Sequence, residues 1–196
     1  MLYNPDNMIR KSRFVDFYKN CSIEVVESVK KYMSKFIQEN AQYTDRGNYT
    51  HLCNLFTSMA FCFTYEDMGK SREQSIEIVA NAMYKFIQPQ TIKMKKLSKN
   101  ALFIPFLKLT MPLRFKKTLG YGWKVEFPNK KKNEFTMITH ECIYCQLFSK
   151  YDIFELTAVF CHVDDLLYGN LPGAEFIYTQ QKGCGGKYCD YTYRKR

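Results

Sequence analysis

The spacing of apolar residues changes once along the chain, and this change restricts the fold more than any other feature. From Ile23 to Ile87 apolar side chains recur every three or four residues, which places them on one face of a helix. After Gly122 they alternate, in residues 122–127 and 134–139, as they do in half-buried strands. The chain therefore begins with helices and continues with strands.

Residues that begin and end helices divide the first half. Ser22 can cap a helix that ends near Asn40. A second helix is predicted over residues 49–68. Gly69 is expected to end it, because the residue after a helix often has a left-handed backbone conformation, which glycine adopts at the lowest energetic cost. Residues 1–21 are predicted to form a short helix or an irregular arm.

The third helix is predicted to begin at a capping box. Ser71 and Gln74 have the spacing of this motif, and Pro89 is expected to end or kink the helix. Residues 90–119 contain two further prolines and are predicted to form broken helices.

The second half alternates between strands and helices. A polar loop over residues 128–133 joins the first two strands as a hairpin. Residues 140–150 and 153–167 have a helical pattern, and residues 175–181 and 187–194 have the pattern of a second strand pair. This order predicts an α+β fold, in which an N-terminal helical half packs on a C-terminal antiparallel sheet with two intervening helices.

The length of 196 residues and the apolar content of 46% are enough for one domain with a full core. We expect a single domain over residues 1–196, mainly helical in residues 1–119 and α+β in residues 120–196. The first residues lack the apolar core of a signal peptide, and no apolar run is long enough to cross a bilayer. We therefore expect a cytoplasmic protein whose eight cysteines are reduced.

Most of the positive charge lies in one window. Of the net charge of +10, residues 90–133 carry +11, because Glu126 is their only acid. The basic residues are Lys93, Lys95, Lys96, Lys99, Lys108, Arg114, Lys116, Lys117, Lys124, Lys130, Lys131 and Lys132. A solvated helix face with a charged loop explains this window, and a weak contact with an anionic membrane or an acidic partner is the alternative. No helix-turn-helix, zinc-finger or RNA-recognition motif supports a nucleic-acid partner.

Side chains that bind metals or transfer protons gather in the last third of the chain. They are His140, Cys142, Cys145, Cys161, His162, Asp164, Asp165, Cys184, Cys189 and Asp190. The C-x-x-C spacing of Cys142 and Cys145 occurs in structural, metal-binding and catalytic thiols, and the spacing alone leaves all three open. No cofactor is required by the sequence, but a zinc ion has four possible ligands: Cys142, Cys145, Cys161 and His140.

The predicted elements indicate which of these side chains can meet. Cys161 and Asp164 are three residues apart and hence neighbours on one helix face, although a solvated aspartate at a helix end is equally ordinary. On the last strand, Cys189 points to one face of the sheet and Asp190 to the other. The glycine turn at residues 183–186 can offer N–H groups to an anion, or can serve only as a turn.

A set of short motifs spans the last part of the chain. These motifs are Gly120-Tyr-Gly-Trp123, Cys142, Glu155-Leu-Thr157, Phe160-Cys161-x-x-Asp164, Thr179, and Gly185-Gly-x-x-Cys189-Asp190-Tyr191. Together they resemble the L-2-amino-thiazoline-4-carboxylic acid hydrolase family of bacteria. The chain departs from the family pattern at Tyr178, where an arginine is expected, and at Cys145 and Cys184, where no cysteine is expected.

The resemblance implies a hydrolase for a small-molecule substrate, a cyclic amidine whose thiazoline ring opens to an N-carbamoyl amino acid. It implies four catalytic candidates: Cys142, Cys161, Asp164 and Asp190. Either cysteine would be the nucleophile or a ligand of a metal that activates water, and the two aspartates would be base and acid. Substrate contacts are implied for His140, Thr179, Gly185, Gly186 and Cys189. We expect the four catalytic candidates to converge on one pocket.

A second hypothesis belongs to another functional class. The C-terminal pattern of cysteines and glycines also resembles, more distantly, the vinyl-reductase-like ligand-binding domains. This resemblance implies a noncatalytic module that holds a metal or small ligand, as a sensor or as an accessory of a biosynthetic pathway.

Overall fold

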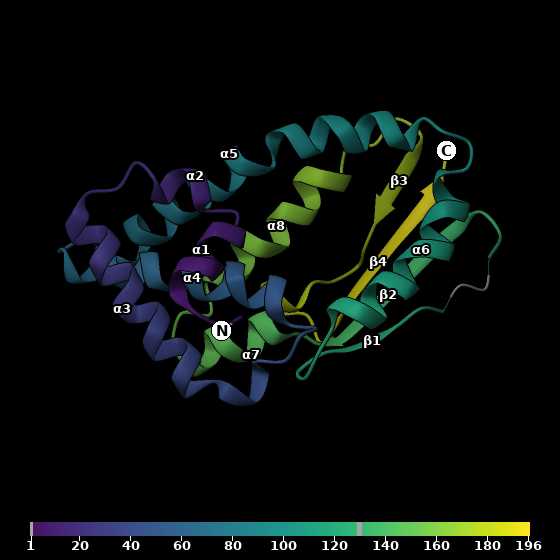
Figure 1. Ribbon diagram of the computed structural model, residues 1–196. Helices are drawn as coiled ribbons and strands as arrows, with labels where there is room; N and C mark the ends of the chain where they lie inside the picture. The colour runs from purple at the N-terminus through teal and green to yellow at the C-terminus, as the bar shows by residue number, and fades with distance from the viewer. Residues whose placement is uncertain (1, 129–130) are drawn as a thin grey trace. The chain divides into compact units, whose positions relative to one another are not determined.

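The computed structural model describes residues 2–128 and 131–196. Its contacts divide the chain into two compact units, Met1–Phe86 and Ile87–Arg196, each with buried apolar residues of its own. The first unit is helical and the second combines helices with a sheet (Figure 1). The predicted α+β class is therefore confirmed, while the single domain stays a prediction.

The first unit is built around one helix that is buried on most of its circumference. Its elements are α1 (Pro5–Lys11), α2 (Val15–Tyr18), α3 (Ile23–Glu39), the 3₁₀ turn η1 (Ala41–Tyr43), α4 (Tyr49–Asp67) and the first part of α5 (Arg72–Ser98). α4 is the buried helix, and α3 packs along it. Their contact includes tilted aromatic pairs such as Phe36 with Phe56, whose ring centroids are 5.9 Å apart.

The helix ends of this unit follow the sequence signals. The Ser22 hydroxyl accepts a hydrogen bond from the Val25 N–H and caps α3. Gly69 follows α4 with φ +86, in the left-handed region. The Gln74 N–H donates to the Ser71 hydroxyl (3.2 Å) while the Ser71 N–H donates to the Gln74 side chain (3.0 Å). The predicted capping box is confirmed by this reciprocal pair.

The prediction that Pro89 ends the third helix was wrong. α5 continues through Pro89 to Ser98, and residues 103–118 form one further helix, α6 (Phe103–Thr118), with Pro112 inside it. A proline inside a helix removes a single backbone hydrogen bond, and the surrounding turns retain theirs. Pro105 lies in the first turn of α6, where the N–H has no partner in the helix anyway. Among the described residues, no helix is both long and apolar enough to cross a membrane.

The second unit contains a four-stranded antiparallel sheet of order β1-β2-β4-β3 (Figure 1). The strands are β1 (Lys124–Glu126), β2 (Glu134–Glu141), β3 (Ala174–Ile177) and β4 (Cys189–Lys195), and the helices α7 (Ile143–Lys150) and α8 (Leu156–Tyr168) lie between β2 and β3 in sequence. β1 pairs with β2 and β3 pairs with β4, as predicted. The two strand pairs form one sheet because β2 also pairs with β4. Asn129 and Lys130 of the predicted polar loop lie outside the described residues.

One helix was predicted to begin too early. His140 and Glu141 were expected to begin it, but both belong to β2, which extends to Glu141. The alternation of β2 continues because Thr139 still pairs with Cys189 of β4. α7 begins only at Ile143, after Cys142 in extended conformation.

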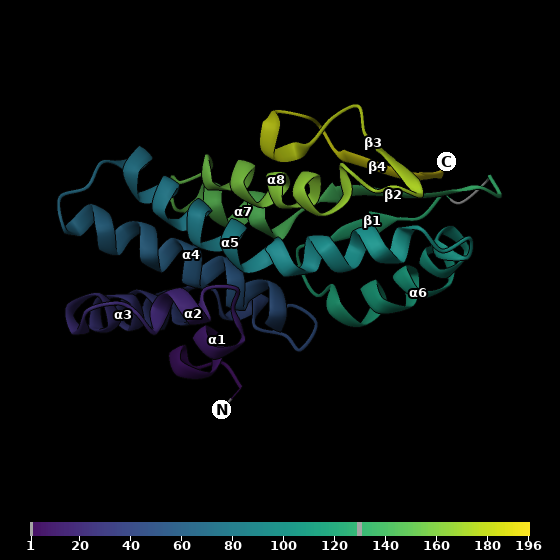
Figure 2. The same ribbon diagram turned by 90° about the horizontal axis from the view of Figure 1, so that it is seen from above.

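The sheet has one face that carries the core of the unit. Phe135 and Tyr193 are buried partners on this face, and α6 packs against it through Phe103, Ile104 and Leu107. Figure 2 shows α6 lying along the sheet on this side. On the opposite face, the hydroxyls of Thr136 and Thr192 are 3.1 Å apart. A polar pair of this kind is ordinary where a face is not covered by the core.

Gly69 offers a test of backbone strain free of crowding. A Cβ at this position would meet no atom within 4 Å, so only the left-handed φ opposes a side chain. Gly69→Ala is expected to destabilise the protein by about 1 kcal/mol, and Gly69→Asn by less, because asparagine tolerates this conformation better. Urea denaturation measures both. Equal losses for the two variants would contradict the strain explanation.

Candidate functional site

A stripe of polar side chains on α8 lies beside β4. Thr157, Cys161 and Asp164 follow one another at intervals of four and three residues and therefore share one helix face. On β4, Cys189 and Tyr191 point to the same face of the sheet because they are two residues apart. The two stripes meet, since the Tyr191 hydroxyl donates a hydrogen bond to the Asp164 carboxylate and the charges of Cys189 and Asp164 both act on Cys161.

A tight turn closes one end of these stripes. It is the 3₁₀ turn η2 (Lys182–Cys184), and its N–H groups point at sulfur atoms. The Lys182 N–H donates to Cys189 Sγ (3.3 Å), and the Gly183 N–H donates to Cys161 Sγ. A Cβ on Gly183 would lie 2.6 Å from Cys161 Sγ and 2.7 Å from the Thr157 methyl carbon. Only glycine therefore fits at residue 183 without a shift of its neighbours.

Cys142 belongs to the same group of thiols. It is the residue before α7, with an extended backbone, and its thiol forms a hydrogen bond with that of Cys145. A negative charge on Cys142 would raise the pKa of both Cys161 and Cys189, so the three thiols lie within electrostatic reach of one another. We call Cys142, Cys161, Cys189 and Asp164 the thiol cluster.

The thiols of the cluster are held in the protonated form. Burial raises the pKa of Cys161 and of Cys189, although the N–H donors of η2 act in the opposite direction. The pKa of Cys142 is raised well above its ordinary value, first by the hydrogen bond with Cys145 and then by burial. A thiolate at neutral pH therefore requires a proton acceptor nearby, and Asp164 is a carboxylate in position for this role.

Asp190 is not brought together with the cluster. It follows Cys189 on β4 and so faces the other side of the sheet, where its carboxylate accepts three hydrogen bonds. The donors are the Thr179 N–H (2.9 Å), the Thr179 hydroxyl (2.5 Å) and the Gln180 N–H (3.0 Å). Asp190 thus fastens the segment after β3 to β4. Of the four catalytic candidates, the structure brings Cys142, Cys161 and Asp164 together and places Asp190 on the other face, while their convergence on a pocket stays a prediction.

The predicted substrate-contacting residues other than Cys189 also have structural partners. His140 Nε2 lies 3.0 Å from Glu126 Oε1 on β1. Thr179 holds Asp190, while the N–H groups of Gly185 and Gly186 donate to carbonyls within their own turn. Within residues 2–128 and 131–196, no three or more His, Cys, Asp or Glu side chains are placed to hold a metal ion.

Two residues of the site were not predicted as catalytic or substrate-binding, although one of them, Thr157, lies in a motif of the family resemblance. The Thr157 hydroxyl is buried and has no hydrogen-bond partner among the described residues. Gln181 is buried and donates a hydrogen bond to the Tyr191 hydroxyl (3.2 Å). The same hydroxyl donates to the Asp164 carboxylate. The spacing of four residues between Thr157 and Cys161 was a usable signal. Nothing in the sequence indicated the contact of Gln181 with Tyr191, because it depends on the path of the turn.

Comparison with known proteins places this arrangement in a family. The family model of L-2-amino-thiazoline-4-carboxylic acid hydrolase matches residues 53–193. The chain belongs to this family. No curated protein and no solved structure matches the chain. The matched segment of the hydrolase family contains the whole thiol cluster, η2 and the Asp190 contacts.

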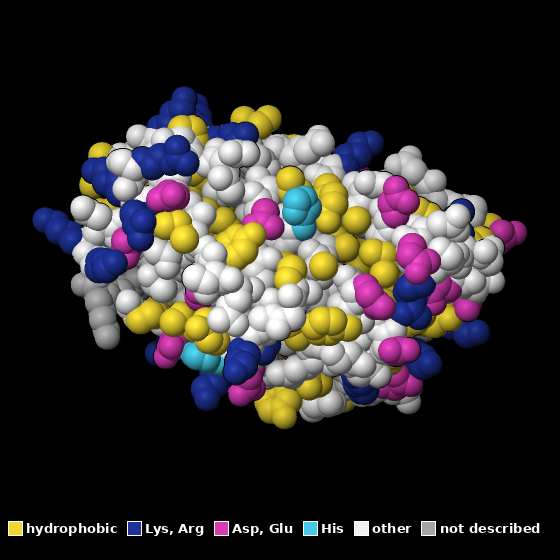
Figure 3. Space-filling model, turned by 180° about the vertical axis from the view of Figure 1, so that it is seen from behind, with side chains coloured by type: hydrophobic (Ala, Val, Ile, Leu, Met, Phe, Trp, Pro, Cys, Tyr) yellow, Lys and Arg dark blue, Asp and Glu magenta, His cyan; other side chains and the backbone are white. Residues whose placement is uncertain are grey.

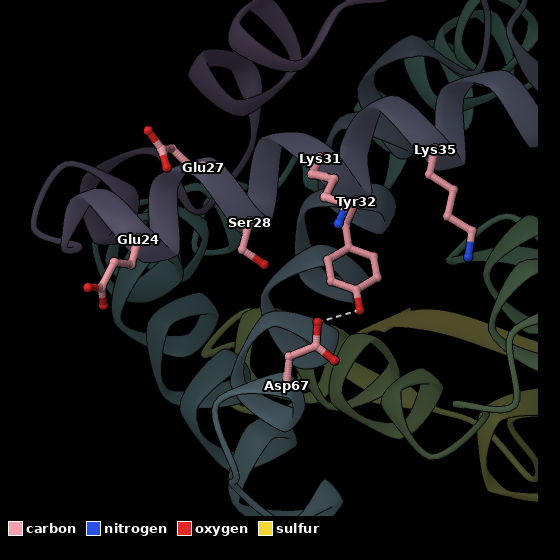
Figure 4. A pocket seen from close by; sticks show the side chains of 7 residues that line it. All are labelled: Glu24, Glu27, Ser28, Lys31, Tyr32, Lys35 and Asp67. Atoms are coloured by element: carbon pink, nitrogen blue, oxygen red, sulfur yellow. Dashed lines mark hydrogen bonds between the residues drawn. The ribbon is translucent and has the colours of Figure 1, made fainter.

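A pocket in the first unit is lined mainly by residues outside the segment that matches the hydrolase family. Six of its lining residues belong to α3 and the seventh, Asp67, ends α4 (Figure 4). The Tyr32 hydroxyl donates to Asp67 (2.7 Å), and the other labelled side chains are mostly charged groups on the helix surface. None of the residues predicted from the sequence to form the site lines this pocket. The thiol cluster is therefore the candidate site of this hydrolase-family chain.

The fastening role of Asp190 predicts a dependence of stability on pH. Burial alone would raise the pKa of Asp190, but the hydrogen bonds from Thr179 and Gln180 outweigh it, and the pKa lies below its ordinary value. The ionised carboxylate therefore stabilises the fold above the pKa of the unfolded chain, near 3.9, and this contribution is lost as pH falls through the lower folded value.

Asp190→Asn is accordingly expected to lower the free energy of unfolding by about 1–2 kcal/mol at neutral pH and by much less in strong acid. Urea denaturation over a range of pH measures this. Asp16→Asn is the control, because Asp16 makes an exposed ion pair with Lys19 and should change stability little. A loss that persists undiminished in acid would show that the Asp190 charge is not the cause.

The thiols should differ in their rates of alkylation. Cys184 is exposed, whereas burial disfavours the thiolates of Cys161 and Cys189. Iodoacetamide at neutral pH is expected to label Cys184 first and the two buried thiols only slowly, with rates that rise as pH rises. Peptide mass spectrometry after timed quenching measures the order. Rapid labelling of Cys161 at neutral pH would contradict its protonated state.

Proposed function

We propose that the chain is a hydrolase that opens a cyclic amidine of the thiazoline type at the thiol cluster. The observation that carries this proposal is the meeting of a thiol, a carboxylate and two backbone N–H donors inside the segment that defines the family. The buried Thr157 hydroxyl supports it, because a polar atom without a partner is costly unless a ligand satisfies it. The free cysteines are compatible with a cytoplasmic location.

The reaction replaces a ring bond by the bonds of a urea group. In a 2-amino-thiazoline, the carbon between sulfur and nitrogen is the electrophile. Addition of one water molecule to this carbon and cleavage of its bond to the ring sulfur produce an N-carbamoyl amino acid with a free thiol. The reaction needs a nucleophile, a proton carrier and a donor for the charge that develops on the attacked group.

We assign the nucleophile to Cys161 and the proton carrier to Asp164. Asp164 accepts the thiol proton while the Cys161 sulfur forms a bond to the ring carbon. The bond between this carbon and the ring sulfur then breaks, and Asp164 returns the proton to the departing sulfur. An isothiourea on Cys161 results. Water attacks the same carbon, Cys161 leaves as a thiol, and the urea product is released.

The surrounding groups fit these steps. The Gly183 N–H donates to the Cys161 sulfur and would stabilise the thiolate as it forms. Tyr191, fixed by Gln181, donates to Asp164 and holds this carboxylate in place. In this proposal Asp190 does not transfer a proton. Its hydrogen bonds hold the segment that leads to η2 against β4. Cys142 lies within electrostatic reach of Cys161 and takes no part in these steps.

The residue at position 178 bears on the choice of substrate. Tyr178 stands where an arginine was expected, and its hydroxyl is hydrogen-bonded to Asp165, while burial is the main cause that raises the pKa of Tyr178 to about 12. It carries no positive charge that would hold a substrate carboxylate. Substrates for the assay should therefore include 2-amino-thiazolines both with and without the ring carboxylate.

Cys161→Ala and Asp164→Asn are expected to reduce kcat/KM at least about 100-fold, because each removes a group that acts in the transition state. Cys184→Ser is the control, since it alters an exposed thiol near the same turn and should keep most of the activity. Product formation is measured by chromatography, and Tm shows whether each variant is folded.

Full activity of either folded variant would refute the assigned roles. Binding of the thiazolines by the wild-type protein without turnover would refute the hydrolase and would favour the noncatalytic module.

A further inference from the structure

The helix α6 is apolar on two opposite faces. One face packs on the sheet through Phe103, Ile104 and Leu107. The other face carries four large apolar side chains that solvent reaches. Their exposed fractions are 68% for Leu102, 58% for Phe106, 70% for Leu109 and 60% for Leu113. Helices that are apolar all round are normally covered on all sides, so the outer face of α6 is an exception.

The four exposed side chains form one continuous stripe. Successive members are four, three and four residues apart, which is the spacing of neighbours along one helix face. The stripe runs for roughly 16 Å along the helix at 1.5 Å per residue, parallel to the sheet beneath it. Contiguous exposed apolar surface of this kind marks a site of interaction with another surface.

Positive charge surrounds this stripe. Arg114, Lys116 and Lys117 are exposed in the last turns of α6. Lys108 donates hydrogen bonds to the carbonyls of Lys131 and Lys132, which brings these two exposed residues close to the middle of the helix. Figure 3 views the molecule from the side away from α6, where further dark blue side chains gather at one end.

The combination of an apolar stripe and flanking cations selects one kind of surface. An anionic bilayer offers both partners, because apolar side chains enter the boundary of the acyl chains while lysine and arginine remain at the lipid phosphates. The phosphate backbone of a nucleic acid would pair with the cations but would leave the leucines in water. A second copy of the chain would bring two positively charged surfaces together.

We propose that the outer face of α6, with Arg114, Lys116, Lys117, Lys131 and Lys132 beside it, binds the surface of an anionic lipid bilayer. The helix lies in the plane of the interface, and the sheet supports it from behind. Binding depends on both components. It therefore weakens when the stripe loses apolar groups, when the cations are removed, and when salt screens them.

The experiment is cosedimentation of the full chain with vesicles of phosphatidylcholine, either pure or mixed with phosphatidylserine. The wild-type protein is expected to bind the mixed vesicles at least about tenfold more strongly than the pure ones at low salt, since each nearby cation contributes to binding. Leu109→Ser/Leu113→Ser and Lys116→Gln/Lys117→Gln are each expected to weaken binding to mixed vesicles about tenfold.

The control variant is Ile23→Ser, because Ile23 is an equally exposed apolar residue at the start of α3. It should bind as the wild type does. All four substituted residues of α6 are exposed, so Tm should change little.

Equal binding to both kinds of vesicle, or binding that the α6 variants leave unchanged, would overturn the proposal. Sedimentation without lipid tests the other occupant. A dimer that Leu109→Ser/Leu113→Ser dissociates, together with no vesicle binding by the wild type, would assign the stripe to a second copy and would also overturn it.

Discussion

The register between β2 and β4 is the constraint on which the second unit depends. Opposite Phe135, Met137 and Thr139 it places Tyr193, Tyr191 and Cys189 on the core face. A shift by one residue would turn all three β4 side chains outward and would bring Asp190 into an apolar core. The buried tyrosines and the satisfied carboxylate of Asp190 therefore favour the same register from the two faces of one strand.

This register also explains which parts were predictable from the sequence. Helix caps at Ser22 and Ser71 depend on residues three positions away, so local spacing predicted them correctly. The strand pairs followed from alternation, and the opposite orientation of Cys189 and Asp190 followed from their adjacency. The expectation that Cys142, Cys161 and Asp164 come together depended on the family resemblance, because the elements that carry them can meet through several faces.

The errors have physical causes as well. Proline was given too much weight at residue 89, since α5 continues through it although a proline there removes one backbone hydrogen bond and crowds the preceding turn. His140 was assigned to a helix because the residues after it are helical, whereas the pairing of Glu141 with Lys124 of β1 extends the strand past it. Asp190 was chosen as a catalytic candidate because it shares a motif with Cys189, although strand alternation had already placed the two side chains on opposite faces.

The burial of the thiols lowers their reactivity at rest. A cysteine that is protonated at rest is protected from oxidation and from chance electrophiles, since the thiolate is the reactive form. Cys161 would become a nucleophile only when Asp164 accepts its proton, and this carboxylate is held by Tyr191. On this proposal the resting thiol reacts slowly with chance electrophiles, because the thiolate forms only when a substrate is bound beside it.

The absence of space at Gly183 has a consequence for sequence variation among relatives. A methyl group there would overlap both the Cys161 sulfur and the Thr157 methyl carbon. Neither neighbour can relieve the overlap alone, so a single substitution at residue 183 leads to a crowded site. A relative with a side chain at this position would need smaller residues at both helix positions, so the three positions are expected to change together or not at all. Covariation of these residues would then mark the members of the family that have abandoned the thiol.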